Sequence, residues 1–214
     1  MNTDSSFGVN PPSGAARPAP SQGRSRLTAE RFLTAAFNLL ETKTFDELAV
    51  ADLAREAGRS VGAFYQRFGS KDDFLATLLV AYFDGREDDN ARILAEGRDE
   101  QVVDAVLADN FSAIMRNYNL WHAALRKSAQ DPAFWSQFHK YVHRRPHLMA
   151  VRLGEIRGAA LSEQEVYRLG VALQVFNSVI NNQMMNNPGP LLLRNPEFLP
   201  TLLKVVGAVY AAAL

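Results

Sequence analysis

The 214-residue sequence contains no cysteine, which excludes disulfide bonds and thiolate metal sites and fits a reducing cytoplasm. It also carries no net charge, because 23 lysines and arginines balance 23 aspartates and glutamates. Any affinity for a polyanion must therefore come from a local patch of basic side chains. The apolar run at 205–214 is far shorter than the roughly 20 residues that span a bilayer. The sequence thus predicts a cytoplasmic protein without membrane contact.

Sustained alternation of apolar and polar residues, which marks a half-buried strand, is also absent. From Leu27 onward, apolar residues recur at three- and four-residue steps, as they do on one face of a helix. The pattern predicts an all-α fold with a disordered tail (1–26), a three-helix unit (27–72) and a larger helical body (73–214). The tail is rich in Pro, Gly, Ser and Ala, and it lacks the apolar run of a signal peptide.

Start and stop signals place the helices within both units. Thr28 is expected to cap the first helix, and Gly58 to end the second in a left-handed conformation. Pro146 is expected to bend or split a helix that runs from 132 toward 157. Further helix starts are predicted by the capping residues Ser60, Ser70, Asp131 and Ser162.

Residues 50–68 have the pattern of a helix, a tight glycine turn and a second short helix. A plain helical hairpin has the same pattern. Here, however, Val61, Phe64 and Phe68 are expected to point inward from the second helix, leaving small and polar residues outside. Such a helix can enter the major groove of DNA, where glutamine suits adenine and arginine suits guanine or phosphate. The residues expected to contact DNA are Arg24, Arg26, Arg59, Ser60, Gly62, Ala63, Tyr65, Gln66, Arg67 and Lys71.

Charge alone supports this interpretation weakly. Residues 1–71 hold nine basic and seven acidic side chains, an excess of only two positive charges. The placement of the basic groups, and not their number, must therefore create any positive surface.

Three segments of the N-terminal unit resemble the DNA-binding domain of the TetR family of transcriptional regulators. They are FNLLETKTFD (37–46), VADLAREAG (50–58) and SVGAFYQRFGSK (60–71), within a resemblance that covers about 27–80. The resemblance implies a homodimer that binds a two-fold symmetric operator, pairs through its last two helices and responds to a small-molecule effector. By position, it implies DNA contacts for Ala63, Tyr65, Gln66 and Lys71.

The sequence departs from the family pattern at four positions. Thr44 stands where glycine is frequent, which would cost about 1 kcal/mol if the residue were left-handed. Ala49 replaces a hydroxyl residue that commonly caps the second helix, and Arg59 occupies a usually apolar turn position. Arg67 replaces a more frequent histidine or tyrosine, so the operator sequence does not follow from the resemblance.

Aromatic residues are concentrated in the middle of the chain, where they form either a core or an apolar pocket for a ligand. The pocket interpretation names Phe111, Met115, Tyr118, Trp121, His122, Phe138, Tyr141 and Asn177 as ligand-binding residues, and the ligand as apolar or amphipathic. His139, His143 and His147 share a helical face at metal-binding spacing, but neighbouring basic residues and Pro146 favour a solvated basic face. No metal site or cofactor is expected.

The last two long helices carry apolar stripes that bury either within the monomer or against a second copy. These stripes are Val166, Leu169, Leu173, Phe176 and Ile180, and then Leu202, Leu203, Val206, Val209 and Tyr210. With no nucleophile–base pair or phosphate loop apparent, an enzyme is not expected.

The sequence thus favours a dimeric one-component repressor that an effector releases from its operator. Two alternatives stay open: a DNA-binding factor without an effector, and an all-α ligand-binding or protein-interaction module without DNA readout. The near-neutral head supports the second alternative.

Overall fold

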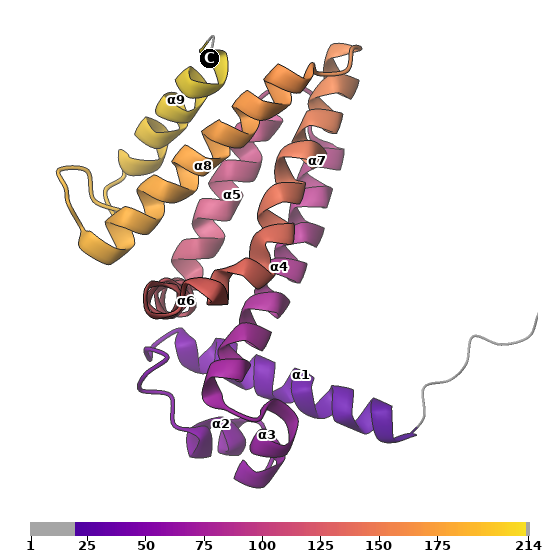
Figure 1. Cartoon of the computed structure of the whole chain (residues 1–214), viewed down its shortest axis with the longest axis vertical. Helices are drawn as coiled ribbons and strands as arrows, with labels where there is room; N and C mark the ends of the chain where they lie inside the picture. The colour runs from indigo at the N-terminus through magenta and orange to yellow at the C-terminus, as the bar shows by residue number, and fades with distance from the viewer. Residues whose placement is uncertain (1–19, 213–214) are drawn as a thin grey trace, which may run out of the picture.

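The computed structural model describes residues 20–212, with side chains from residue 25 onward. Within this range the fold is all-α, as predicted, with no strand. Figure 1 shows α1–α3 gathered in a head at one end, with α4 running from the head into an upright helical body. The elements are α1 (Pro20–Leu40), α2 (Val50–Glu56), α3 (Val61–Phe68), α4 (Lys71–Glu96), α5 (Val102–Arg116), α6 (Tyr118–Gln130), the 3-10 helix η1 (Pro132–Phe138), α7 (His139–Arg157), α8 (Glu163–Asn186) and α9 (Phe198–Ala211).

Four phenylalanine rings form the centre of the head. Phe32 of α1 and Phe64 of α3 meet edge to face, with their centroids 5.4 Å apart. Phe68 and Phe74 complete the cluster, with centroids 4.6 Å apart. Phe32, Phe64 and Phe74 are fully buried, so the cluster fixes α3 against both α1 and the start of α4.

Local signals set the turns on either side of α3. Gly58 has φ 61°, a left-handed conformation that costs glycine little and ends α2. The Ser60 hydroxyl accepts a hydrogen bond from the Ala63 amide at 3.2 Å, and the Ser70 hydroxyl accepts one from Asp73 at 3.0 Å. The predicted stop at Gly58 and caps at Ser60 and Ser70 are therefore confirmed.

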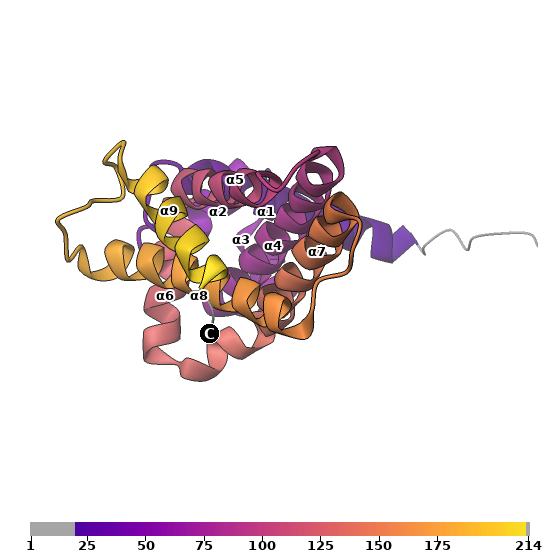
Figure 2. The ribbon, with the colours of Figure 1, turned by 90° about the horizontal axis from the view of Figure 1, so that it is seen from above.

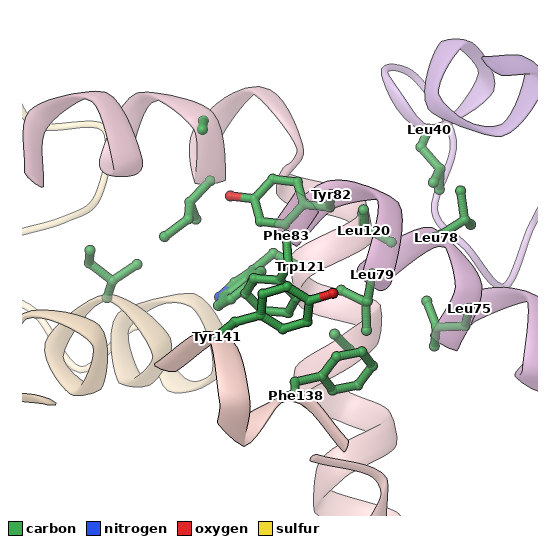
Figure 3. Packing of buried hydrophobic residues seen from close by; sticks show 14 of the residues in the cluster. Leu40, Leu75, Leu78, Leu79, Tyr82, Phe83, Leu120, Trp121, Phe138 and Tyr141 are labelled. Carbon is green, nitrogen blue, oxygen red and sulfur yellow. The ribbon is translucent and has the colours of Figure 1, made fainter. Parts of the chain in front are cut away.

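The body is a bundle in which α4, α5, α7 and α8 run alongside one another, with α9 against α8 and α6 lying across the end nearest the head (Figures 1 and 2). At 26 residues, α4 is about 39 Å long. Figure 3 shows its apolar side chains continuing from Leu75 and Leu78, near the head, to Tyr82 and Phe83 among the body aromatics. None of the helices in the described range is long and apolar enough to cross a membrane.

A buried polar group joins α4 to α5. Arg86, which is 4% exposed, donates to Asp89 at 2.6 Å and also to Asp109. Asn90 and Asn110 lie beside it, and the Asn110 side-chain amide donates to the Val106 carbonyl at 2.8 Å. The guanidinium is thus compensated by two carboxylates and by amide oxygens, as a buried cation must be.

The structure differs from the sequence predictions at the starts of two helices. Helix α1 begins at Pro20, because proline suits a first turn and 21–27 contain no further proline. Residues 20–26 are therefore helical, and Thr28 lies inside the helix. The expected tail at 1–19 lies outside the described residues. Asp131 does cap the next segment, but that segment is a 3-10 helix.

Helix α7 continues through Pro146, so the split that was one of the two outcomes expected there does not occur, although proline cannot donate the helical hydrogen bond to the carbonyl four residues earlier. The expectation about Val61 was wrong. Val61 is 41% exposed, because the first turn of α3 projects beyond the phenylalanine cluster. Phe64 and Phe68 point inward as predicted.

We expect Phe64→Ala to lower the free energy of unfolding by about 3–5 kcal/mol, because it removes the ring at the centre of the head cluster. The neighbouring Tyr65→Ala, at an exposed position, should cost about 1 kcal/mol or less. Urea unfolding followed by far-ultraviolet circular dichroism measures both values. Equal midpoints for the two variants would contradict this account of the head.

Candidate functional site

The outer side of α3 carries three exposed polar side chains. Tyr65 is 50% exposed, and Gln66 and Arg67 are exposed beside it. Phe64 and Phe68 hold the opposite side of the helix in the core. The Arg67 guanidinium lies 5.8 Å from the centroid of the Phe68 ring, and it forms no ion pair with any described residue. The helix therefore presents donors and acceptors to solvent from a rigidly packed base.

Most of the other residues predicted to contact DNA lie at the N-terminus of α3 and on α1. Gly62 is exposed, while Ala63 is half-buried against the core. The Ser60 hydroxyl oxygen caps the helix, and the Arg59 guanidinium donates to the Gly58 carbonyl at 3.0 Å. Arg26 lies on α1, exposed, and pairs with Glu30 at 3.3 Å. The Arg24 side chain lies outside the described residues.

Lys71, in the first turn of α4, is partly engaged by the head itself. Its ammonium group donates to the Asp46 carbonyl at 3.2 Å and lies 4.9 Å from the centroid of the Phe45 ring. Burial lowers the pKa of Lys71 below its usual range, against the opposite effect of Asp46 and Asp72. Reaching a phosphate would therefore require this side chain to exchange an internal partner for an external one.

The departures from the family pattern have local explanations. Thr44 does not adopt a left-handed conformation, so it carries no strain of that kind. Its amide and hydroxyl instead donate to the Glu47 carboxylate, at 2.9 and 2.8 Å. Ala49 is the N-cap of α2 and supplies no side-chain hydrogen bond, so this helix start is weaker than that of α3.

The body contains a cavity of about 990 Å³ between α4, α5, α6, η1, α7 and α8. Such a volume suits a small organic ligand. Aromatic side chains line part of it, and burial raises the pKa of Tyr82 to about 12. Its lining includes Tyr82, Phe83, Asn110, Ile114, Trp121, Trp135, His139, Val142, His143, Arg145, Pro146, His147, Glu163, Val166, Tyr167, Gln174, Asn177 and Asn181.

Two of the eight predicted ligand-binding residues, Trp121 and Asn177, line this cavity, and the other six do not. Phe111 stacks on Phe198, and Tyr118 stacks on His122. Phe138 is fully buried, Tyr141 donates from its hydroxyl to Asp84 at 2.6 Å, and Met115 is half-buried on α5. These six side chains point into the core or along neighbouring helix faces.

Tyr82, Phe83 and Arg145 also line the cavity, although the sequence did not predict them there. Figure 3 shows Phe83 among Trp121, Phe138 and Tyr141, where it stacks on Tyr141 at 4.9 Å. Apolar periodicity assigns Tyr82 and Phe83 to an inner face, but it does not separate a face that packs from one that borders a cavity. For Arg145, the only available signal was a basic residue in the helix that also carries the histidines.

The histidine face borders the cavity from α7. His139, His143 and His147 all line it and are exposed, and the rings of His139 and His143 lie 5.8 Å apart. In the described part of the chain, no three His, Asp or Glu side chains are arranged to hold a metal ion.

Helix α6 connects the cavity with the head. The Trp121 indole in the cavity wall donates to Asn181 of α8 at 2.9 Å. On the same helix, Asn119 donates to the Leu40 carbonyl at 2.8 Å, where α1 ends. Arg126 pairs with Asp46 and Lys127 with Asp72, each at 2.6 Å. A displacement of α6 would therefore change its hydrogen bonds and ion pairs with the head.

The stripes expected to pair two copies are mostly buried inside the protomer. Leu169, Leu173, Phe176, Ile180, Leu202 and Val206 are buried where α8 and α9 pack on the body, while Val166, Leu203, Val209 and Tyr210 are half-buried. The monomer-core alternative thus accounts for these stripes. The outer face of α9 instead exposes Val205 at 45%, next to Lys204 and Ala208.

The structure thus combines a helix-turn-helix head with an all-α body that contains a cavity. The head is similar in sequence to a family of regulators. Residues 32–78 match the family of bacterial regulatory proteins described as the tetR family. The chain is also 48% identical over 58 residues to the uncharacterized HTH-type transcriptional regulator YwcC of Bacillus subtilis, a match that spans 26% of that protein. The match to this family thus covers the head and the start of α4.

Solved structures resemble the whole fold at low identity. A TetR transcriptional regulator from Rhodococcus sp. RHA1 is 19% identical, with a TM-score of 0.58, over 90% of this chain and 99% of that one. The fatty acid degradation regulator FadR from Bacillus halodurans is 16% identical, with a TM-score of 0.63, over 86% of this chain and 95% of that one. These likenesses show that the fold of head and body together occurs in other solved structures.

We expect Ser60→Ala to lower the free energy of unfolding by about 1 kcal/mol, because it removes the N-cap of α3. The control is Ser136→Ala, since that exposed hydroxyl donates to the Ala133 carbonyl and caps no helix. This change should cost less than about 0.5 kcal/mol. Urea denaturation of the two variants in parallel tests the assignment, and an unchanged Ser60→Ala midpoint would refute it.

Proposed function

We propose that this protein is a dimeric one-component transcriptional repressor that a small-molecule effector releases from a palindromic operator. The observation that carries the proposal is the exposed polar side of α3, held on a rigid aromatic core. Gln66 and Arg67 have the chemistry to read base edges, and Tyr65 and Lys71 to contact phosphates. Acting on an operator would place the protein in the cytoplasm.

A second copy would supply the second recognition helix. In a two-fold dimer, the two α3 helices would enter successive major grooves about 34 Å apart. The face of α9 around Val205 is open to a partner, because the inner stripes are already buried. The small side chain of Ala208, three residues from Val205 on this face, would allow two helices to approach closely.

The effector would occupy the body cavity and act on the head through two helices. Helix α4 contributes Tyr82 and Phe83 to the cavity and Phe74 to the head core. Helix α6 contributes Trp121 to the cavity and Arg126 to the ion pair with the head. A ligand that favours one arrangement of these helices by a few kcal/mol would change operator affinity accordingly.

DNA binding is tested by fluorescence anisotropy on duplexes from the region upstream of the gene, over a range of salt concentrations. Lys71→Ala should weaken binding on all sequences and reduce the slope of log affinity against log salt by about 1. Gln66→Ala should cost about 1–3 kcal/mol and relax the base preference at one position per half-site. Tyr65→Ala should weaken binding without changing the base preference.

Matched controls are Val151→Ala and Lys140→Ala, exposed residues of the body helix α7 that do not line the cavity. Neither should change the affinity for DNA. Salt-independent binding, or head variants that behave like these controls, would refute the operator proposal.

The dimer is tested by sedimentation equilibrium. Val205→Glu places a charge on the open face of α9 and should give a 23.7 kDa monomer with strongly reduced operator affinity. Val151→Glu is the control, because Val151 is 63% exposed on α7 and should leave the dimer intact. A Val205→Glu protein that remains dimeric would show that the copies pair elsewhere.

A further inference from the structure

Arg145 is a cation in the cavity wall that no described residue compensates. It lies on α7 and borders both the large cavity and a small crevice beside Phe83 and Tyr141. Its Nε atom is enclosed and has no hydrogen-bond partner. No hydrogen bond or ion pair connects the rest of its guanidinium to any residue of the described range. Arg145 is half-buried, and a charge that is partly removed from water without a protein partner is costly, so its position requires a reason.

Other arginines in the body show that the chain normally satisfies such groups. Arg152 and Arg168 also have an enclosed Nε without a partner. However, Arg152 donates to Glu155 and to the Gly97 carbonyl, and Arg168 donates to the Ala212 carbonyl. Arg86 pairs with two carboxylates, those of Asp89 and Asp109. Among these four, Arg145 alone makes no hydrogen bond.

Two carboxylates could compensate Arg145, but one pairs with another arginine and the other is exposed on α8. Glu87 accepts from Arg144 at 3.1 Å. Glu163, the one carboxylate among the lining residues, is exposed in the first turn of α8. Burial, together with the charge of Arg86, lowers the pKa of Arg145, against the effects of Tyr82 and Glu87. An arginine nevertheless remains charged at neutral pH, so the cavity wall holds one positive charge that forms no ion pair with a described residue.

We propose that the effector is a monoanionic carboxylate with an apolar body, and that Arg145 binds its carboxylate. A guanidinium offers two parallel N–H donors that match the two oxygens of a carboxylate. One unpaired cation balances one negative charge. The aromatic lining, including Trp121, Trp135 and Tyr82, would cover the apolar body of the ligand. The inference rests on the proposed role of the cavity as an effector site.

The two tryptophans of the chain, Trp121 and Trp135, both line the cavity, so intrinsic fluorescence reports directly on its occupancy. The probes are decanoate, decanol and decyltrimethylammonium, which share a chain length and differ in the charge of the head group. All are titrated below their micelle-forming concentrations into the full-length protein. We expect decanoate to bind about 10- to 100-fold more tightly than decanol, and the cation to bind most weakly.

Arg145→Met should abolish this preference for decanoate while leaving decanol affinity unchanged, so that decanol binding confirms an intact cavity. Arg145→Lys should retain part of the preference, because it keeps the charge and loses the paired donors. Arg145→Gln is the second neutral variant, should the methionine variant fail to fold. Arg152→Met, on the same helix but outside the cavity, should keep the full preference.

Thermal unfolding gives a readout that a purely structural arginine would not. Arg145→Met should raise the Tm of the ligand-free protein, because it removes a half-buried charge that has no protein partner, whereas Arg152→Met should lower it. Equal affinity for decanoate and decanol, or a full preference in Arg145→Met, would overturn the proposal. Decanoate that binds without altering operator affinity would instead refute effector release and leave the carboxylate site standing. If only ligands without a carboxylate released the operator, the carboxylate site would be refuted and effector release would stand.

Discussion

The apolar stripe of α4 packs into two cores at once, and the relation between head and body depends on this shared packing. Phe74 joins the phenylalanine cluster that fixes α3, while Phe83 stacks on Tyr141 beside the cavity, more than two helical turns later. Gly85 lies inside the helix without interrupting it. Because close-packed interiors transmit displacement instead of absorbing it, a movement of Phe83 would also displace Phe74.

The second connection, through α6, is of a different kind. Its ion pairs with Asp46 and Asp72 are largely exposed, so each contributes at most about 1 kcal/mol. The hydrogen bond from Asn119 to the end of α1 adds a similar amount. The head is therefore held rigidly along α4 and loosely across α6. A ligand that acts on Trp121 would need to supply only a few kcal/mol to change the angle between head and body.

The sequence correctly predicted the turns and caps that depend on neighbouring residues. It did not predict the features that depend on how the helices pack against one another. The helix-turn-helix, the turn at Gly58 and the cap at Ser60 follow from neighbouring residues, and they were predicted correctly. The residues that line the cavity were not predicted correctly, because adjacent positions on a helix differ by about 100° in direction. Ile114 of α5 borders the cavity, while its neighbour Met115 does not. The interhelix packing that decides between them is a property of the whole bundle.

The contrast between Arg86 and Arg145 shows how the body divides its charges. Both guanidinium groups lie between α4 and its neighbours, and each lowers the pKa of the shared neighbour Tyr82 in opposition to burial. Arg86 has two carboxylates and amide oxygens, which makes it part of the framework between α4 and α5. Arg145 faces the aromatic cavity without a partner. A chain that satisfies one arginine near Tyr82 so completely has the means to satisfy the other. An unsatisfied cation in this position is therefore best explained by a partner that comes from solution.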